Sequence, residues 1–198
     1  MTVNKIAVVG AGQMGRGIAQ VFAAAGKQVI IYDISQAIVD ASKAALEKGF
    51  AKQISRGKMT QEDADAILGN ISFSADTDYA GAENVDIVVE AAIERVELKK
   101  SIFKKLDAAT KADCILATNT SSISITEIAS AVEKKDKVIG MHFFNPPVAM
   151  KLIEVIRGGN TSDDTYETVF ALAQEIGKTP VTVSEAPGFV CNRLLIPM

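Results

Sequence analysis

The stretch that decides the fold is Ile6-Ala7-Val8-Val9-Gly10-Ala11-Gly12-Gln13-Met14-Gly15, close to the start of the 198-residue chain. Its first four residues are apolar and predict a buried strand, and a helical pattern over Gln13–Ala25 follows. In this setting Gly10 makes the tight turn, Gly12 lets the backbone approach a pyrophosphate, and Gly15 lets the helix pack closely on the strand. The N-terminus of the helix then faces the anion. The pattern is the fingerprint of a dinucleotide-binding turn.

A carboxylate stands where such a site needs one. The predicted strand Val29–Tyr32 ends at Asp33, which follows Gly15 by 18 residues. At this spacing an acid accepts a hydrogen bond from the 2′-hydroxyl of the adenosine ribose. Because the same acid repels a 2′-phosphate, the sequence favours NAD over NADP. The alternative is a tight turn that binds nothing, but strand, turn, helix and acid together favour the binding site.

Short apolar runs alternate with longer helical patterns along the rest of the chain. The predicted strands are Ile6–Val9, Val29–Tyr32, Ile71–Phe73, Ile87–Val89, Cys114–Ala117 and Val138–Met141, and the predicted helices are Gln13–Ala25, Ser35–Arg56, Thr60–Leu68, Val96–Ala109 and Ser162–Ile176. Thr60 with Asp63 marks the start of one of these helices. The alternation predicts an α/β fold of the Rossmann type, a doubly wound, mainly parallel sheet with flanking helices.

Composition excludes several classes of function. The net charge of −3 argues against a general nucleic-acid binder, which needs a strongly basic face. No apolar run approaches the roughly 18 residues of a membrane helix. The two cysteines have no metal-ligand spacing and predict no metal site. We expect a cytoplasmic protein with reduced cysteines, which does not act at a membrane.

The only histidine, His142, follows the predicted strand Val138–Met141. It therefore falls at the carboxyl end of a parallel strand, where open α/β sheets bind their ligands. The polar segments 119–122 and 90–94 follow two other predicted strands in the same way. A lone histidine is more often structural or simply exposed, but this location favours a functional imidazole.

Glu154 lies among four aliphatic residues in the run 152–156. A buried carboxylate needs a partner, and an imidazole is a suitable one. The pair would orient the His142 ring and stabilise its protonated form. The alternative is an edge strand on which Glu154 faces water.

Lys48, Lys52 and Arg56 are spaced by four and share one face of the predicted helix Ser35–Arg56. One interpretation is an ordinary solvated helix surface. The other is a landing site for the phosphate of a substrate handle, which lysine can bind as a point charge.

With these residues in place, the chain resembles the L-3-hydroxyacyl-CoA dehydrogenase family, and within it the bacterial 3-hydroxybutyryl-CoA dehydrogenases. The resemblance covers essentially the whole chain. The segments that carry it are Val8–Gly15, Asn119–Ser122, His142–Pro147, Lys151–Val155 and Pro187–Arg193. It implies an NAD-dependent oxidoreductase that interconverts 3-hydroxyacyl-CoA and 3-ketoacyl-CoA thioesters in fatty-acid and butanoate metabolism.

The resemblance also implies a role for individual residues. His142 becomes the general base, Glu154 its carboxylate partner, and Ser121 and Asn192 the groups that hold the substrate oxygen. The predicted cofactor contacts are Gly10, Gly12, Gln13, Met14, Gly15, Asp33, Glu94, Lys99, Ser121 and Asn145. Ser121, Lys52 and Arg56 are the predicted contacts of the acyl-CoA substrate, of which the last two would meet the coenzyme A handle.

Residues 1–186 are expected to form the NAD-binding domain, and residues 187–198 to begin the helix that connects it to the family's C-terminal helical domain. That domain, which makes the family's dimer interface, is expected to be absent from this chain. Two alternatives stay open: a non-enzymatic, cofactor-binding or structural member of the family, and a sister dehydrogenase for a free hydroxy acid. The presence of all four of Ser121, His142, Glu154 and Asn192 favours the enzyme.

Overall fold

Eight strands form one sheet in the computed structural model, which describes residues 2–186 and 188–190. The strands are β1 (Lys5–Val9), β2 (Gln28–Tyr32), β3 (Ile71–Ser74), β4 (Ile87–Glu90), β5 (Ile115–Thr118), β6 (Val138–Phe143), β7 (Leu152–Arg157) and β8 (Thr179–Ser184). Their order is β3-β2-β1-β4-β5-β6-β7-β8, and within the described chain only β6 and β7 pair antiparallel. The predicted mainly parallel sheet is confirmed.

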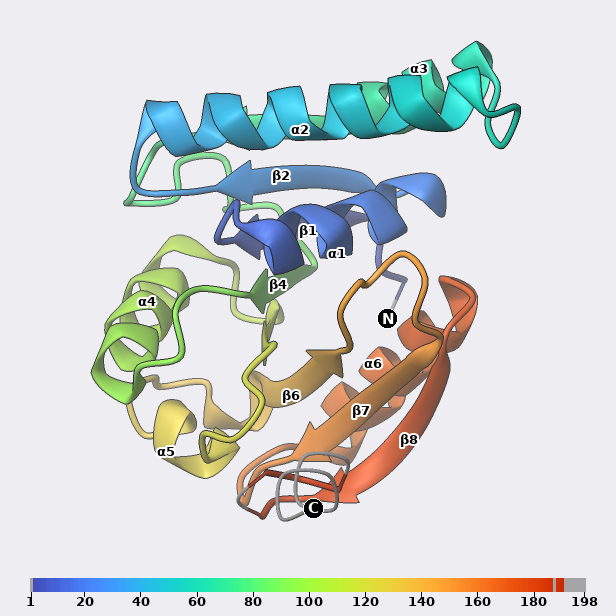
Figure 1. Ribbon diagram of the computed structural model, residues 1–198. Coiled ribbons are helices and arrows are strands. Elements are labelled where there is room, and N and C mark those ends of the chain that lie inside the picture. Colours follow the sequence, from blue (N-terminus) through green and yellow to red (C-terminus); the bar gives the residue numbers. More distant parts are fainter. Residues whose placement is uncertain (1, 187, 191–198) are drawn as a thin grey trace.

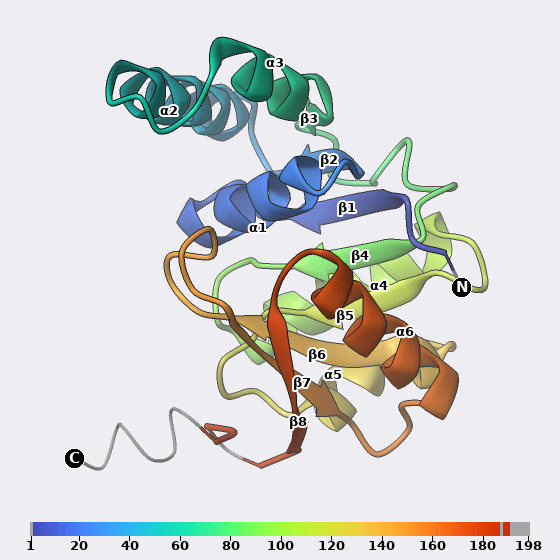
Figure 2. The ribbon, with the colours of Figure 1, turned by 90° about the vertical axis from the view of Figure 1, so that its right-hand side faces the viewer.

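Helices cover both faces of this sheet (Figures 1 and 2). They are α1 (Gln13–Ala24), α2 (Gln36–Ser55), α3 (Gln61–Gly69), α4 (Val96–Ala109), α5 (Ile125–Ala129) and α6 (Asp163–Glu175), with a short 3-10 turn at Lys135–Lys137. Residues of α1, α2, α3 and α6 pack into one hydrophobic cluster, and residues of α4 and α5 pack into a second. The fold is therefore doubly wound. No helix in the described part of the chain is long and apolar enough to cross a bilayer.

Local side-chain chemistry sets where several helices begin. Ser35 caps α2 by accepting a hydrogen bond from the backbone of Ile38, and Ser162 caps α6 in the same way. Thr60 and Asp63 form a reciprocal capping box at the start of α3. Such caps satisfy backbone N–H groups that have no partner within the helix. The predicted start of α3 is thus confirmed.

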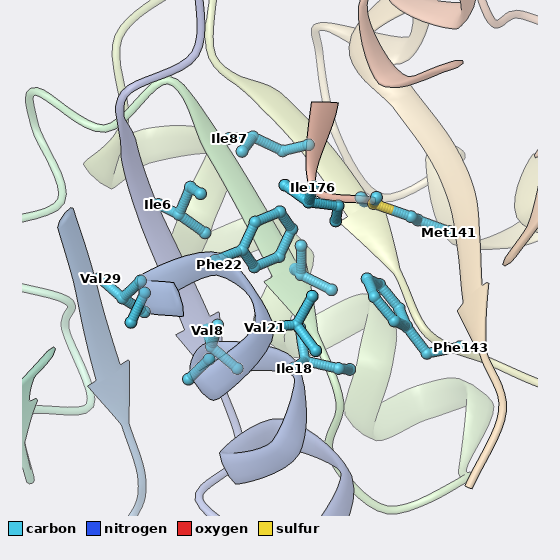
Figure 3. Packing of buried hydrophobic residues seen from close by; sticks show 14 of the residues in the cluster. Ile6, Val8, Ile18, Val21, Phe22, Val29, Ile87, Met141, Phe143 and Ile176 are labelled. Atoms are coloured by element: carbon cyan, nitrogen blue, oxygen red, sulfur yellow. The ribbon is translucent and has the colours of Figure 1, made fainter. Parts of the chain in front are cut away.

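The core under α1 is built around Phe22, which has no exposed surface (Figure 3). Its ring meets that of Phe143 edge-on at a centroid distance of 6.1 Å. This contact joins α1 to the end of β6, so the first helix and the histidine-bearing strand share one hydrophobic cluster. Burial of aromatic and aliphatic surface of this kind is the main stabilising contribution to the fold.

Three features differ from the sequence prediction or decide between its alternatives. β6 continues to Phe143, so His142 lies inside the strand, because pairing with β7 extends it. β7 is not an edge strand, since β8 pairs with its other side. β8 and α5 were not predicted. β8 is largely exposed and contains Pro180. Its sequence therefore lacks the run of apolar residues by which a buried strand is recognised.

The strand order creates a crevice at β1. The chain passes from β1 to β2 on one side, whereas β4 pairs with β1 on the other. The loops at the carboxyl ends of β1 and β4 therefore diverge, which is where doubly wound folds bind nucleotides.

Candidate active site

The turn between β1 and α1 requires glycine at two positions. Gly10 has a φ of +103°, and a Cβ atom there would lie 2.7 Å from the carbonyl oxygen of Ala91. A Cβ atom on Gly15 would lie 1.7 Å from the carbonyl oxygen of Gly10. At Gly12, no described atom lies within 4 Å of the position that a Cβ would take. The geometry thus fits a tight turn at Gly10, close helix packing at Gly15 and an open backbone at Gly12.

A pocket of about 590 Å³ opens beside this turn. Gly12 and Asp33 line it, and the Asp33 Oδ2 atom accepts a hydrogen bond from the Ala11 backbone at 2.6 Å. Ile34 and Ile93, which are 78% and 71% exposed, present apolar surface to the same pocket. A glycine turn, a carboxylate and exposed apolar surface therefore surround one cavity, which is the combination that a dinucleotide site needs.

The loop after β6 returns to the start of α1 (Figure 2). The Gln13 side-chain amide donates to the Asn145 Oδ1 atom at 3.1 Å. Pro147 packs so closely on α1 that a Cβ on Gly17 would lie 3.0 Å from its ring. Met14 is half-buried and packs against the hydrophobic cluster of this face. Two predicted cofactor contacts, Gln13 and Asn145, are therefore brought together although 132 residues separate them.

His142 and Glu154 form a buried pair. They face each other in the antiparallel register of β6 and β7, and the His142 Nδ1 atom lies 2.8 Å from the Glu154 Oε2 atom. The histidine side chain is 8% exposed and the glutamate side chain 1%. A carboxylate accepts hydrogen bonds, so Nδ1 carries the proton and Nε2 is left to act on a substrate. The alternative of a water-facing Glu154 is wrong.

The segment that follows β8 covers this pair. The Val190 backbone N–H donates to the Glu154 Oε1 atom at 3.2 Å. The rings of Phe144 and Phe189 lie 4.7 Å and 5.9 Å from the imidazole. Such surroundings exclude water and so strengthen the electrostatic interaction between the imidazole and its carboxylate partner.

Ser121 follows β5, next to the strand that carries His142. Its backbone N–H and its hydroxyl donate to the Glu94 Oε1 atom at 2.8 Å and 3.3 Å. The Asn119 Oδ1 atom accepts a hydrogen bond from the Phe143 backbone at 2.8 Å, which ties this loop to the end of β6. The structure therefore brings Ser121, Glu94 and the region of His142 to one edge of the sheet.

Glu94 is held as an anion. Desolvation by partial burial raises its pKa, but hydrogen bonds from Thr120 and Ser121 and the charge of Lys99 lower it more. The net pKa of Glu94 is below its ordinary value. A carboxylate that accepts several hydrogen bonds keeps its charge in this way.

Lys99 lies deeper than the prediction of a cofactor contact suggested. It is 1% exposed, and its ammonium bonds both oxygens of Glu90, at 2.7 Å and 2.9 Å. The Glu94 Oε2 atom is 3.3 Å away. Lys99 therefore lies deeper in the protein than Glu94, with which it pairs. Sequence reasoning assigned no role to Glu90, although an acid that ends the apolar run Ile87–Val89 was a usable signal.

The basic residues of α2 lie elsewhere. Lys52 and Arg56 are exposed near the end of α2, which belongs to the β2 and β3 side of the sheet (Figure 1). The strand order places β1, β4 and β5 between β2 and the histidine strand β6. The structure does not bring these cations next to the His142–Glu154 pair, so one ligand would have to be long to touch both.

Asn192, predicted to hold the substrate oxygen, lies outside the described residues, as does most of the segment 187–198. Within the described part, no cluster of histidine, cysteine or acidic side chains could hold a metal ion. Cys114 is fully buried, and desolvation raises the pKa of its thiol to about 11. A thiol of this kind is a packing group and not a nucleophile.

Comparison with known proteins agrees with this geometry. The family model of the "3-hydroxyacyl-CoA dehydrogenase, NAD binding domain" matches residues 5–186. The 3-hydroxybutyryl-CoA dehydrogenase of Clostridioides difficile is 50% identical over 98% of this chain and 68% of its own length. The crystal structure of (S)-3-hydroxybutyryl-CoA dehydrogenase from Ralstonia eutropha superposes with a TM-score of 0.95 and 44% identity, over all of this chain and 69% of that one.

A third relative is longer. The crystal structure of 3-hydroxybutyryl-CoA dehydrogenase from Escherichia coli K12 has a TM-score of 0.95 and 38% identity, and covers all of this chain and 41% of that one. The chain thus spans about two thirds of the Clostridioides relative and less than half of the Escherichia chain. On these matches it belongs to the 3-hydroxyacyl-CoA dehydrogenase family, of which it spans the NAD-binding domain.

Proposed function

We propose that these residues form the cofactor-binding half of an NAD-dependent 3-hydroxyacyl-CoA dehydrogenase whose substrate is a short acyl thioester such as 3-hydroxybutyryl-CoA. The observation that carries the proposal is the buried His142–Glu154 pair, because the carboxylate engages the Nδ1 atom and so leaves the Nε2 atom for proton transfer. The names of the relatives support the substrate class.

The chain's own residues supply binding, orientation and proton transfer. The glycine turn and Asp33 would hold NAD, which would supply the acceptor for the hydride from C3 of the hydroxyacyl group. The His142 Nε2 atom takes the proton of the 3-hydroxyl, and the imidazolium that results is stabilised by Glu154. In the opposite direction the imidazolium returns this proton to the alkoxide that develops at C3. Ser121 turns its one hydroxyl proton from Glu94 to the same oxygen and so donates a hydrogen bond to it. Donors and charges positioned around the reacting oxygen supply most of the rate acceleration.

The cofactor site favours NAD over NADP in this proposal. Asp33 stands at the end of β2, lines the pocket and is already anchored by the Ala11 backbone. Its carboxylate accepts from a 2′-hydroxyl but meets a 2′-phosphate with charge repulsion. The N-terminus of α1 supports binding of the pyrophosphate, because Gly12 has no side chain with which to cap it.

We further propose that turnover needs a second domain, and that Asn192, Lys52 and Arg56 complete the acyl-CoA site with it. The relatives support this, since this chain spans only part of each. NADH should bind to the 198-residue chain, whereas reduction of acetoacetyl-CoA should be very weak. The "extended protein", in which residue 198 is followed by the family's helical domain, should be active. Activity of the 198-residue chain equal to that of the extended protein would contradict this proposal.

The test of the proposed function is a hydride-transfer assay of the extended protein with acetoacetyl-CoA and longer 3-ketoacyl-CoAs, with NADH and NADPH in parallel. His142→Gln is expected to abolish turnover and to change the Kd of NADH by no more than a few-fold. If the variant keeps most of the activity, the assignment of His142 is wrong. If the wild-type protein binds NADH but turns over no thioester, the chain is a cofactor-binding member of the family without this activity.

A further inference from the structure

A buried polar cluster lies beneath the loop that carries Ser121. Its buried members are Glu90 at the end of β4, Lys99 on α4 and Thr118 at the end of β5, and its outer member is Glu94 after β4, whose side chain is 38% exposed. Glu90 and Thr118 have no exposed surface, and Lys99 is 1% exposed. No step of the proposed mechanism uses Glu90 or Thr118. Because burial of charge is costly unless it is paired, such a cluster calls for a physical explanation.

Each oxygen of Glu90 has its own partners. The Oε1 atom accepts from the Ala92 backbone at 2.7 Å, and the Oε2 atom accepts from the Thr118 hydroxyl at 2.7 Å. Both oxygens accept from the Lys99 ammonium. Glu90 therefore joins the ends of β4 and β5 to α4 through one side chain. All of these partners require the ionised carboxylate, which only accepts hydrogen bonds.

Two routes lead from Glu90 to Ser121. In the first, Lys99 contacts the Glu94 Oε2 atom at 3.3 Å, and the Glu94 Oε1 atom accepts from the backbone of Ser121 at 2.8 Å. In the second, the Thr118 hydroxyl that donates to Glu90 accepts from the Thr120 backbone at 3.2 Å. Both routes end in the turn that presents the Ser121 hydroxyl.

The charges explain why Glu90 is needed. Lys99 lies between two carboxylates, and Glu90 holds it more closely than Glu94 does. When Glu90 is ionised, its charge neutralises the Lys99 ammonium. The Glu94 carboxylate can then accept the hydrogen bonds of the turn. Without that charge, the buried ammonium would depend on Glu94 alone, and Lys99 would no longer hold Glu94 in its place beside Ser121.

We infer that Glu90 is a positioning residue: through Lys99 and Thr118 it holds Glu94 and the 120–121 turn, and so places the Ser121 hydroxyl for the reacting oxygen. The inference rests on the proposed function for the role of Ser121. The geometry of the 120–121 turn is independent of that function, because it can be measured in the absence of turnover.

The first measurement is amide hydrogen exchange of Ser121 in the 198-residue chain. Glu90→Gln keeps the shape of the side chain but removes its charge and one of its two acceptors. Exchange at Ser121 is expected to accelerate at least about tenfold, because its hydrogen bond to Glu94 opens more often. The control is Glu97→Gln on α4, which removes a carboxylate that is 86% exposed and that pairs with Lys100 at 3.9 Å. It should leave exchange at Ser121 unchanged.

The second measurement is steady-state kinetics of the extended protein. Glu90→Gln is expected to lower kcat by about 10- to 100-fold, because small misplacement of a reacting group has effects of this size. The KM of acetoacetyl-CoA should change by no more than about threefold, since the ground-state contacts remain. Unchanged kcat together with unchanged exchange at Ser121 would overturn the inference.

A double variant separates positioning from stability. Glu90→Gln with Lys99→Met replaces the buried ion pair by neutral side chains of similar size, which proteins often tolerate without loss of stability. Its melting temperature should be close to that of the wild-type protein, while kcat stays low because Glu94 has lost its anchor. Restoration of wild-type kcat in this variant would show that the pair serves stability alone. If the wild-type extended protein itself is inactive, the proposed function fails, and exchange at Ser121 still decides the inference.

Discussion

Adding one methyl group at Gly12 or at Gly15 should separate ligand binding from folding. The two glycines belong to the same turn, and alanine is the smallest change at each. At Gly15, the new Cβ would lie 1.7 Å from the carbonyl oxygen of Gly10 and 2.9 Å from its carbonyl carbon. At Gly12, it would meet no described atom within 4 Å. The same substitution therefore causes a steric clash at Gly15 but leaves the ligand-free fold undisturbed at Gly12.

The size of each effect follows from these distances. Ordinary van der Waals contact of a Cβ begins at 3.4 Å, so at Gly15 the backbone of the turn has to move by more than an ångström. Overpacking of a core typically costs about 1–3 kcal/mol, and a clash with backbone falls at or above the upper end. For a protein of this size, 3 kcal/mol corresponds to a fall in melting temperature of roughly 6–12 °C.

Thermal unfolding and NADH titration of the 198-residue chain measure both effects. Gly15→Ala should lower the melting temperature by roughly 6–12 °C. Gly12→Ala should change it by no more than about 2 °C, since its cost is that of an exposed substitution. The Kd of NADH should nevertheless rise at least about tenfold in Gly12→Ala, because the methyl group occupies the path of the pyrophosphate. If Gly12→Ala binds NADH as the wild-type chain does, the pyrophosphate does not lie on this turn, and the proposed cofactor geometry is wrong.

Three further outcomes are expected. Glu154→Gln should lower kcat of the extended protein about 10- to 150-fold, since charge-assisted hydrogen bonds contribute about 1.5–3 kcal/mol and each 1.36 kcal/mol is a factor of ten. The exposed control Glu167→Gln should not change kcat, and an unaltered pH–rate profile of Glu154→Gln would count against the pairing. Asp33→Ser should weaken NADH binding and narrow the preference for NADH over NADPH, and an unchanged ratio of the two Kd values would show that another group discriminates. The pKa of Glu94 is lowered, so its bonds to the turn are fully present above its ordinary pKa of 4.5 and are lost as the pH falls through the lower folded value. Hydrogen–deuterium exchange of Ser121, corrected for intrinsic rates, should stay constant from pH 7 to about 5, and a loss of protection already near pH 6 would contradict the assignment.

The cofactor half of the site could be read from the sequence because its residues are close together in the chain. Gly10, Gly12 and Gly15 lie within six residues and Asp33 ends the next strand, so strand, turn and helix bring them together by local geometry alone. In the structure, Gly12 and Asp33 line the same pocket. Most strands were predicted for the same reason, since a doubly buried parallel strand is a continuous apolar run.

The environment of the His142–Glu154 pair could only be partly predicted. The run around Glu154 is compatible with an edge strand or an internal strand, and the difference depends on β8, which lies 25 residues further along and has little apolar pattern. Lys99 was predicted to contact the cofactor, but its partner Glu90 belongs to a different element. Sequence spacing does not show which of two carboxylates takes a buried lysine.

The sequence by itself therefore determined the fold class, the dinucleotide turn and the identity of the polar groups that end the strands. The tertiary structure decided which of these groups are buried and which are paired. His142 meets Glu154 through an antiparallel register, and Ser121 is held through a cluster that joins β4, β5 and α4. The physical reason is that periodicity records whether a residue faces the core, whereas pairing of charges depends on distances between elements that are far apart in the chain.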